Sequence, residues 1–210
     1  GNGVHTLSAN NGVQFDLNGT GVQSQVGWVS AGDGLLVMDR NFDGVINNGT
    51  ELFGTATKLA NGNRAGDGFT AMNAEDSNGD GKLSSTDANW NQLRVWVDAD
   101  SDGSTDIGEL LSLDQLGVVE LDLNAQRGTE MDNGNLLGLV SNYKTSDGKT
   151  HDMADVWFSK NQDTKSVPDA GIASADSVAA SAVVDANTPL AQEEPQAAGT
   201  SAIKDLTKLV

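Results

Sequence analysis

Three segments of this 210-residue sequence place Asp, Asn and Gly at the same relative positions. They begin at Asp39, Asp76 and Asp98, and each has oxygen-bearing side chains at its first, third and fifth positions and Gly at its sixth. This spacing is the pattern of a 12-residue calcium loop, in which the Gly permits a sharp turn and the oxygens converge on one ion. The pattern predicts a fold organised around loops that bind a hard cation.

The three loops differ in how they close. Loops 76–87 and 98–109 end on an acidic residue at the twelfth position. In loop 39–51 the closing acid, Glu51, stands one place late, which a bulged loop end at Gly49 would allow. Loop 98–109 carries five carboxylates, so we expect it to bind calcium most tightly.

Each loop supplies candidate ligands to one of two or three calcium ions. In loop 39–51 they are Asp39, Asn41, Asp43, the Val45 carbonyl and Glu51. In loop 76–87 they are Asp76, Asn78, Asp80, the Lys82 carbonyl and Asp87. In loop 98–109 they are Asp98, Asp100, Asp102, the Ser104 carbonyl, Asp106 and Glu109. Any one such cluster is also typical of ordinary turns, but three copies of the same spacing favour calcium.

The acidic balance of the chain favours cations over nucleic acids and anionic membranes as partners. The formal net charge is −18, from 30 Asp and Glu against 12 Lys and Arg, and both of those partners need clustered basic residues. No apolar run approaches the roughly 20 residues that cross a bilayer, which predicts no membrane insertion. With no Cys in the chain, disulfides, thiolate metal sites and Cys nucleophiles are excluded.

A change of composition divides the chain after Phe158. All aromatic residues lie at or before this position, and all three prolines follow it. We expect residues 1–158 to form the calcium-binding, EF-hand-like module. Residues 159–210, rich in Ala, Ser and Asp, are expected to be a disordered tail or linker, because a segment without aromatic residues buries too little surface to offset its ordering entropy. The apolar spacing of residues 201–210 is compatible with one or two helical turns.

The module is predicted to be α+β, with short strands and short helices around the calcium loops. Apolar stretches bounded by Gly, Asn and Asp predict strands at residues 13–17, 26–29, 35–38, 94–97, 118–123, 136–143 and 153–158. Helices are expected at residues 51–59, 69–75, 86–93 and 107–113.

No catalytic apparatus is identifiable in the sequence, so enzymatic activity stays open. The two histidines, His5 and His151, lack a Gly-x-Ser-x-Gly setting for a nucleophile and are interpreted as surface or loop residues. Carboxylate pairs are so plentiful that inventory alone does not exclude a glycosidase-like acid and base. The four tryptophans lie on apolar stripes, which assigns them to the core rather than to exposed sugar-binding platforms.

The order of several motifs resembles that of a known family. The motifs are residues 27–39 (GWVSAGDGLLVMD), 48–54 (NGTELFG), 67–69 (DGF) and 93–96 (LRVW), the last two preceding the second and third loops. This arrangement is similar to the calcium-dependent self-processing module of repeat-in-toxin (RTX) proteins and giant bacterial adhesins. The resemblance covers most of residues 1–158, and it rests on the order of the motifs.

The resemblance implies a location and two functions. Modules of that family are exported by type I secretion, fold when they meet external calcium, and cleave an Asp–Pro bond at their own N-terminal edge, leaving an aspartyl end that can join a lysine amine. It therefore implies a calcium-folded, monomeric module of a larger RTX-type protein that is secreted or held at the bacterial surface. The alternative is an autocatalytic module that cleaves an upstream Asp–Pro bond and forms an isopeptide bond.

Two departures from the family pattern bear on the autocatalytic alternative. The sequence starts with Gly1-Asn2-Gly3, where modules of that family have Pro and an Asp-x-Asp-Gly-x-Gly stretch, and it contains no Asp–Pro dipeptide. A third interpretation is a calcium-gated binder of a protein or glycan at a cell surface. It requires an exposed aromatic patch or an open coordination position.

Overall fold

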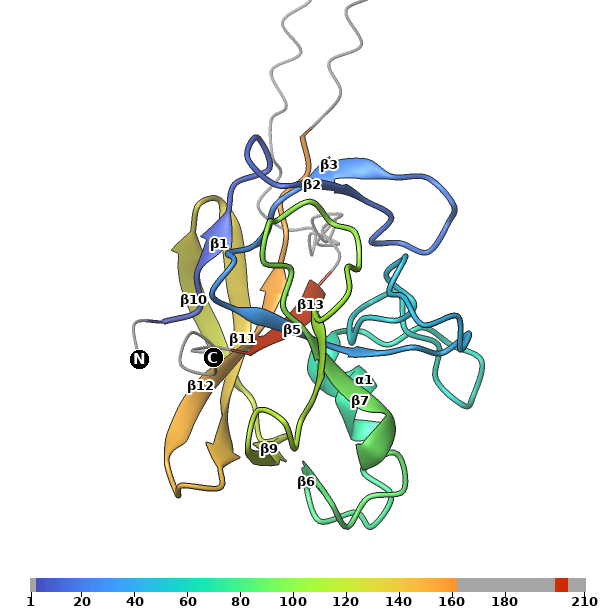
Figure 1. The fold of residues 1–210 in the computed structure, drawn as a ribbon, viewed down its shortest axis with the longest axis vertical. Coiled ribbons are helices and arrows are strands. Elements are labelled where there is room, and N and C mark those ends of the chain that lie inside the picture. Colours follow the sequence, from blue (N-terminus) through green and yellow to red (C-terminus); the bar gives the residue numbers. More distant parts are fainter. Residues whose placement is uncertain (1–2, 162–198, 204–210) are drawn as a thin grey trace, which may run out of the picture. The chain divides into compact units, whose positions relative to one another are not determined.

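The computed structural model describes residues 3–161 and 199–203 (Figure 1). These residues contain thirteen strands, one α-helix, α1 (Gly68–Asn73), and one 3₁₀-helix, η1 (Trp90–Gln92). The strands are β1 (Thr6–Leu7), β2 (Val13–Phe15), β3 (Ser24–Val26), β4 (Trp28–Val29), β5 (Gly34–Met38), β6 (Lys82–Ser84), β7 (Leu93–Trp96), β8 (Leu110–Ser112), β9 (Val118–Asp122), β10 (Gln126–Asp132), β11 (Asn135–Thr145), β12 (Thr150–Trp157) and β13 (Gly199–Ile203).

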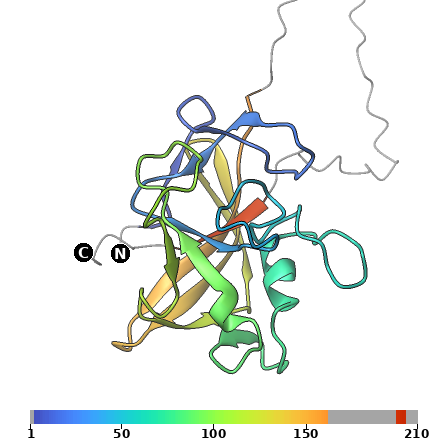
Figure 2. The same cartoon turned by 45° about the vertical axis from the view of Figure 1, so that its right-hand side comes forward.

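A nine-stranded sheet organises the described residues. Its strand order is β6-β9-β11-β12-β13-β5-β7-β8, with β10 paired to β11, and every neighbouring pair is antiparallel. Two small sheets, β1-β4 and β2-β3, complete the strand pairing. Figure 2 shows β13, in red, between the orange strand β12 and the blue strand β5. The last described segment of the chain therefore lies in the middle of the sheet.

The sheet separates two hydrophobic clusters. In β5 all five residues are buried, and alternate residues belong to different clusters: Leu36 and Met38 to one, Leu35 and Val37 to the other. Because successive side chains of a strand point to opposite faces, the two clusters cover the two faces of β5. The sequence of a strand buried on both faces is typically a continuous apolar run, and this is the case for β5.

An aromatic group forms the centre of the second cluster. The Trp28 ring lies 5.0 Å from Phe15, 5.5 Å from Trp96 and 5.7 Å from Phe158, measured between ring centroids. Trp28, Trp96 and Phe158 are completely buried. The prediction that the tryptophans pack in the core is confirmed for Trp28, Trp96 and Trp90, the last of which is 4% exposed, whereas Trp157 is only partly buried.

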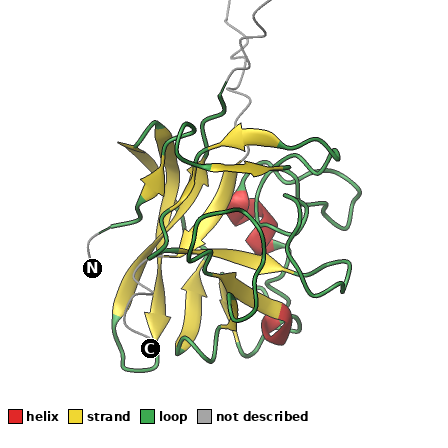
Figure 3. Cartoon of the chain, turned by 45° about the horizontal axis from the view of Figure 1, so that its top comes forward, coloured by secondary structure: helices red, strands yellow, loops and turns green. Residues whose placement is uncertain are grey.

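The predicted α+β class is wrong, because the described residues are predominantly β (Figure 3). Of the four expected helices, only residues 69–75 overlap an α-helix, α1. Residues 51–59 form turns and isolated bridges, and of residues 86–93 only η1 is helical. Each predicted strand overlaps an observed one, whereas strands β1, β6, β8, β10 and β13 were not predicted.

Strand pairing explains why residues 107–113 do not form a helix. Leu110 and Leu111 pair with Trp96 and Val95 of β7, as part of β8. Apolar residues in so short a segment satisfy either periodicity, so the available sheet edge decides the outcome. Ile107, which the helix would have placed among the apolar residues, is fully exposed.

The predicted tail falls largely outside the described residues. Residues 162–198 and 204–210 are not described. Within the expected tail, residues 199–203 form strand β13. This strand includes residues 201–203 of the segment 201–210, whose spacing allows helical turns, and the rest of that segment lies outside the described residues. In the part of the chain that is described, no helix is long and apolar enough to cross a membrane.

Candidate metal centre

The three predicted calcium loops share one hydrogen-bonding scheme. The carboxylate at the first position accepts bonds from the backbone N–H groups of the fifth and sixth residues, and the carboxylate at the fifth position accepts one from the seventh. The sixth residues, Gly44, Gly81 and Gly103, have positive φ angles of 87°, 80° and 75°. This left-handed geometry is easily adopted by glycine, which is why the pattern needs it there.

Loop 39–51 brings three predicted ligands together around a buried carboxylate. One carboxylate oxygen each from Asp39, Asp43 and Glu51 lies within 4.8 Å of the others. The Glu51 side chain is only 1% exposed. Its Oε2 accepts a hydrogen bond of 3.0 Å from the Asn47 N–H, whereas its Oε1 is buried with no hydrogen-bond partner. A buried, unpaired carboxylate oxygen beside two other carboxylates is a position that a cation would satisfy.

The charges in loop 39–51 oppose one another. Burial raises the pKa of Glu51, and the nearby carboxylates of Asp43 and Asp39 raise it further, against the Asn47 N–H bond that lowers it. Ionised Glu51 is therefore unfavourable while the group holds only negative charge. A divalent cation would reverse this balance and hold all three groups ionised.

Gly49 explains how the late closing acid reaches this group. Its N–H donates to the Asp16 carbonyl at 2.8 Å, and a Cβ at position 49 would lie 1.8 Å from the Leu17 carbonyl oxygen. Only glycine permits so close a backbone approach. The thirteen-residue spacing is thus accommodated by a backbone contact with residues 16 and 17, and Glu51 turns inward.

Loop 98–109 also assembles three predicted ligands. Carboxylate oxygens of Asp98, Asp100 and Asp102 lie within 4.8 Å of one another. Asp98 is completely buried, and its Oδ2 accepts a 2.7 Å hydrogen bond from Trp28 Nε1 in the aromatic core. Burial raises the pKa of Asp98, and the Glu109 carboxylate contributes in the same direction.

The closing residue of loop 98–109 lies outside that group. Glu109 Oε2 accepts hydrogen bonds from Trp96 Nε1 at 3.1 Å and from the Asp106 N–H at 3.0 Å, and its Oε1 accepts one from the Ala99 N–H at 2.9 Å. The carboxylates of Glu109 and Asp106 are not among the assembled ligands. Glu109 instead connects the two ends of the loop to the aromatic core.

Loop 76–87 has the shared scheme without an assembled group of three carboxylates among its described residues. Asp87 is buried, and its two oxygens accept hydrogen bonds from the backbone N–H groups of Ser77 and Ser84, both at 2.9 Å. The Lys82 ammonium pairs with Glu120 on β9 at 3.0 Å. Asp87 therefore acts as a closure of the loop backbone in this structure.

Loops 39–51 and 98–109 are joined at their eighth residues. The Ile46 N–H donates to Thr105 Oγ1 at 2.9 Å, and the same hydroxyl donates to the Ile46 carbonyl at 3.2 Å. Ile46 is 1% exposed and belongs to the same cluster as the aromatic group. A change in one loop can therefore be transmitted to the other through two hydrogen bonds.

Sequence reasoning missed three residues of this region. Trp28 and Trp96 were assigned to the core, but their Nε1 groups also donate to loop carboxylates. Thr105 carries no signal of its own, because its role depends on a loop 59 positions away in the sequence. The tryptophan donors could have been suspected, since a buried indole N–H needs an acceptor and the loops supply carboxylates.

A buried acid on β12 was also not predicted. Asp155 is completely buried, and its Oδ2 accepts hydrogen bonds from the Gly68 N–H at 3.0 Å and from Trp157 Nε1 at 3.1 Å. Burial raises the pKa of Asp155 to about 7, although both of these hydrogen bonds lower it. The fold thus holds a carboxyl group that stays protonated in mildly acidic solution.

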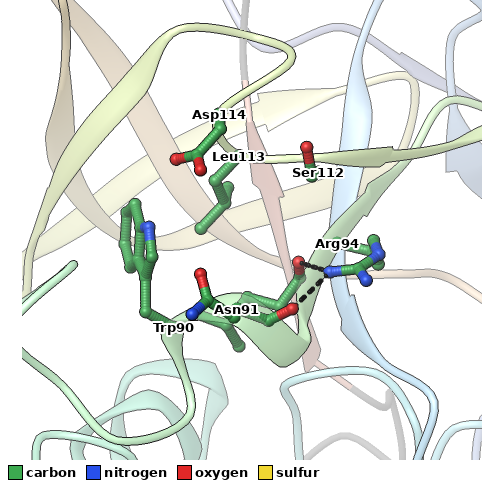
Figure 4. Close-up of a pocket in the computed structure, with 7 residues that line it drawn as sticks. Trp90, Asn91, Arg94, Ser112, Leu113 and Asp114 are labelled. Carbon is green, nitrogen blue, oxygen red and sulfur yellow. Dashed lines mark hydrogen bonds between the residues drawn. The ribbon is translucent and has the colours of Figure 1, made fainter.

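Among the described residues, a hollow of about 340 Å³ includes the exposed Phe42, and a smaller one includes Trp90. The pocket in Figure 4 is lined by Trp90, Arg94, Ser112 and Asp114, among others. Its volume is about 70 Å³. This is the volume of two or three water molecules. The Arg94 guanidinium donates to the carbonyls of Asn91 and Leu93 at 2.8 Å and 2.7 Å, as the dashed lines show. The pocket beside Trp90 is therefore too small for a sugar.

Two comparisons with known proteins cover the N-terminal three quarters of the chain. Residues 1–159 match the SPM domain family. The chain is also 43% identical over 159 residues to the iron-regulated protein FrpA of Neisseria meningitidis serogroup C; the match covers 74% of this chain and 14% of that protein. The chain thus spans only a small part of the length of this relative. The family match includes all three acidic loops and ends just after β12, and on this evidence the chain belongs to the SPM domain family.

Proposed function

We propose that this chain is a calcium-binding module of a secreted or cell-surface RTX-type bacterial protein, and that it folds as it binds external calcium. The observation that carries the proposal is the buried Oε1 of Glu51, which has no hydrogen-bond partner and lies beside the carboxylates of Asp39 and Asp43. A cation would supply the missing partner and offset the repulsion of the group.

Two further features support folding coupled to calcium. The first-position and closing acids of loop 98–109 accept hydrogen bonds from Trp28 and Trp96, so the ligand loop and the aromatic core share contacts. The net charge of −18 favours an expanded chain where divalent cations are scarce. Binding free energy would then contribute directly to folding, as in other proteins whose metal site exists only in the folded state.

The proposal includes the resemblance to self-processing modules of RTX proteins and giant adhesins. The family match over residues 1–159 supports it, because the matching motifs fall within that range. No residue of this chain is assigned a catalytic role, and type I secretion belongs to the proposal on the same basis. The calcium-gated carbohydrate binder receives no support from the pocket beside Trp90.

A calcium titration tests the proposed function. The protein is first freed of metal with a chelator. As the calcium concentration is raised from about micromolar to millimolar, its tryptophan fluorescence is expected to change and its far-UV circular dichroism signal to increase. Magnesium serves as the control and is expected to act only at higher concentration, because it demands a tighter octahedral site. Identical spectra and identical unfolding midpoints with calcium and with chelator would contradict the proposal.

Thr105→Val is expected to uncouple loops 39–51 and 98–109. Valine keeps the shape of threonine but removes the hydroxyl that bonds both the Ile46 N–H and its carbonyl. We expect a loss of about 1–3 kcal/mol of unfolding free energy and a less cooperative calcium-binding curve by isothermal calorimetry. Thr129→Val, on the exposed side of β10, is the control and should change neither quantity. An unchanged binding curve for Thr105→Val would show that the two loops act independently.

A further inference from the structure

Strand β13 holds two halves of the main sheet together. It pairs with β12 along five residues, from Gly199 opposite Trp157 to Ile203 opposite Met153, and with β5 through Ala202 and Ile203. On one side of it lie β12, β11, β10, β9 and β6, and on the other β5, β7 and β8. In the described part of the chain, β12 and β5 are connected within the sheet only through β13.

This strand comes from outside the family match. The match ends at residue 159, and residues 162–198 separate the end of the module from β13 in the sequence. The strand that completes the sheet is therefore supplied by a segment that is remote in sequence from the module. The order of the chain alone therefore does not require β13 to fold together with the module.

The two strands that face β13 are poor candidates for exposed edges. All of β5 is buried, and residues 153–156 of β12 are buried as well. Without a strand between them, the backbone N–H and C=O groups on their facing edges would lose their partners, at a cost that buried backbone groups rarely bear. Main-chain hydrogen bonds supply the affinity in β-augmentation, and here they are available on both sides of the added strand.

We propose that the space between β5 and β12 is an acceptor site for an extended peptide strand, and that residues 199–203 fill it as an exchangeable intramolecular ligand. The chemistry that the site recognises is an extended backbone running antiparallel to both neighbours. The tether keeps the segment at a high effective concentration, so a free peptide enters only when the tethered strand is weakened or released.

Ala202→Pro is the first test, made in the full chain. Residue 202 pairs with Ala154 on one side and with Leu35 on the other. Proline has no backbone N–H to donate at position 202, and it is not tolerated in the middle of a central strand. Backbone amides of residues 153–157 and of residues 34–35 are expected to exchange hydrogen at least about tenfold faster by mass spectrometry. Ala202→Val, which keeps the N–H, is the matched control and should exchange like the original chain.

Peptide capture then distinguishes an acceptor site from a general loss of stability. A fluorescent peptide of residues 197–205 is expected to bind the Ala202→Pro chain and restore protection of the β12 and β5 amides, and to leave the original chain unlabelled. The same peptide carrying proline at position 202 should not bind. Equal binding to both chains, or faster exchange that the peptide does not reverse, would overturn the proposal.

A second measurement applies even where the proline variant does not fold. A site for a specific protease is inserted among residues 162–198, and the folded chain is cleaved there. The released C-terminal fragment is expected to stay with the module on gel filtration and to be replaced by an excess of the labelled peptide. If the fragment separates at once while residues 153–157 keep their protection, the strand is not a ligand of this site. All of these experiments on β13 are made at one fixed calcium concentration. Their results are therefore independent of the proposed calcium response.

Discussion

Glu51→Gln is expected to stabilise the calcium-free protein and at the same time to weaken its binding of calcium. Without the ion, Glu51 is a buried acid whose Oε1 has no partner and whose pKa is raised, chiefly by burial. An amide of the same shape keeps the oxygen that accepts from Asn47 and places an NH₂ group toward the carboxylates of Asp39 and Asp43. Relief of the unpaired buried acid should add about 1–3 kcal/mol to the unfolding free energy.

Calcium is expected to reverse the order of stability of the Glu51→Gln variant and the original chain. The amide removes one negative charge from the ligand set, so calcium affinity at loop 39–51 should fall at least about tenfold, which is 1.4 kcal/mol of binding free energy. The unfolding midpoint of the variant should exceed that of the original chain in chelator and fall below it in calcium, by differential scanning calorimetry.

The control for this prediction is Glu130→Gln, which makes the same change of charge at an exposed position on β10. It should shift neither the midpoint nor the affinity, because surface substitutions away from special features change stability by at most about 0.5 kcal/mol. If Glu51→Gln lowers stability in chelator as well as in calcium, Glu51 contributes to the fold directly and its role as a ligand loses its support.

Asp155→Asn is expected to remove a large pH dependence of stability. In the folded protein burial raises the pKa of Asp155 to about 7, whereas an unfolded Asp ionises near 3.9. Between these two values the unfolded chain releases its proton and the folded chain keeps it, so this residue makes stability fall as pH rises from about 4 to 7. A difference of about three pKa units corresponds to about 4 kcal/mol.

Asparagine cannot ionise, and its amide oxygen can still accept from Gly68 and Trp157 in place of Asp155 Oδ2. Urea unfolding at saturating calcium should therefore show that the unfolding free energy of the variant, relative to that of the original chain, increases from pH 4 to pH 7. Above pH 7 this difference should stay constant. Glu130→Gln, at an exposed position on β10, is the control, and its unfolding free energy should follow that of the original chain at every pH. Parallel curves for Asp155→Asn would mean that Asp155 is ionised in the folded state.

Much of the geometry of the three acidic loops could be predicted from the sequence, because the spacing within each loop is local. Residues within six positions of each other set the first, third and fifth ligands and the glycine turn, and the structure gives each of the three loops the same backbone hydrogen bonds. The late closing acid, Glu51, was also predicted, and it joins Asp39 and Asp43. Glu109 was predicted as a ligand on the same grounds, but its carboxylate is held by Trp96 and Ala99.

The fold class was harder, because short apolar segments carry both helical and strand periodicity. Residues 107–113 satisfy a helix locally, yet β7 offers a free edge to Leu110 and Leu111. Sheet pairing joins residues that are far apart in sequence, and no pattern within one segment reports which edge is available. The same reason hid β13, whose partners are Met153–Trp157 and two residues of β5.

The division between local and tertiary information follows from the range of each interaction. Composition and spacing sufficed for the acidic character, the shared turn geometry of the three acidic loops and the burial of Trp28, Trp90 and Trp96, since each depends on residue type and near neighbours. Only the tertiary structure decides that Thr105 joins two loops, that Trp28 bonds Asp98, that Asp155 is buried and that β13 closes the sheet. Each of these depends on contacts between distant residues, whose free energies exist only after the chain has folded.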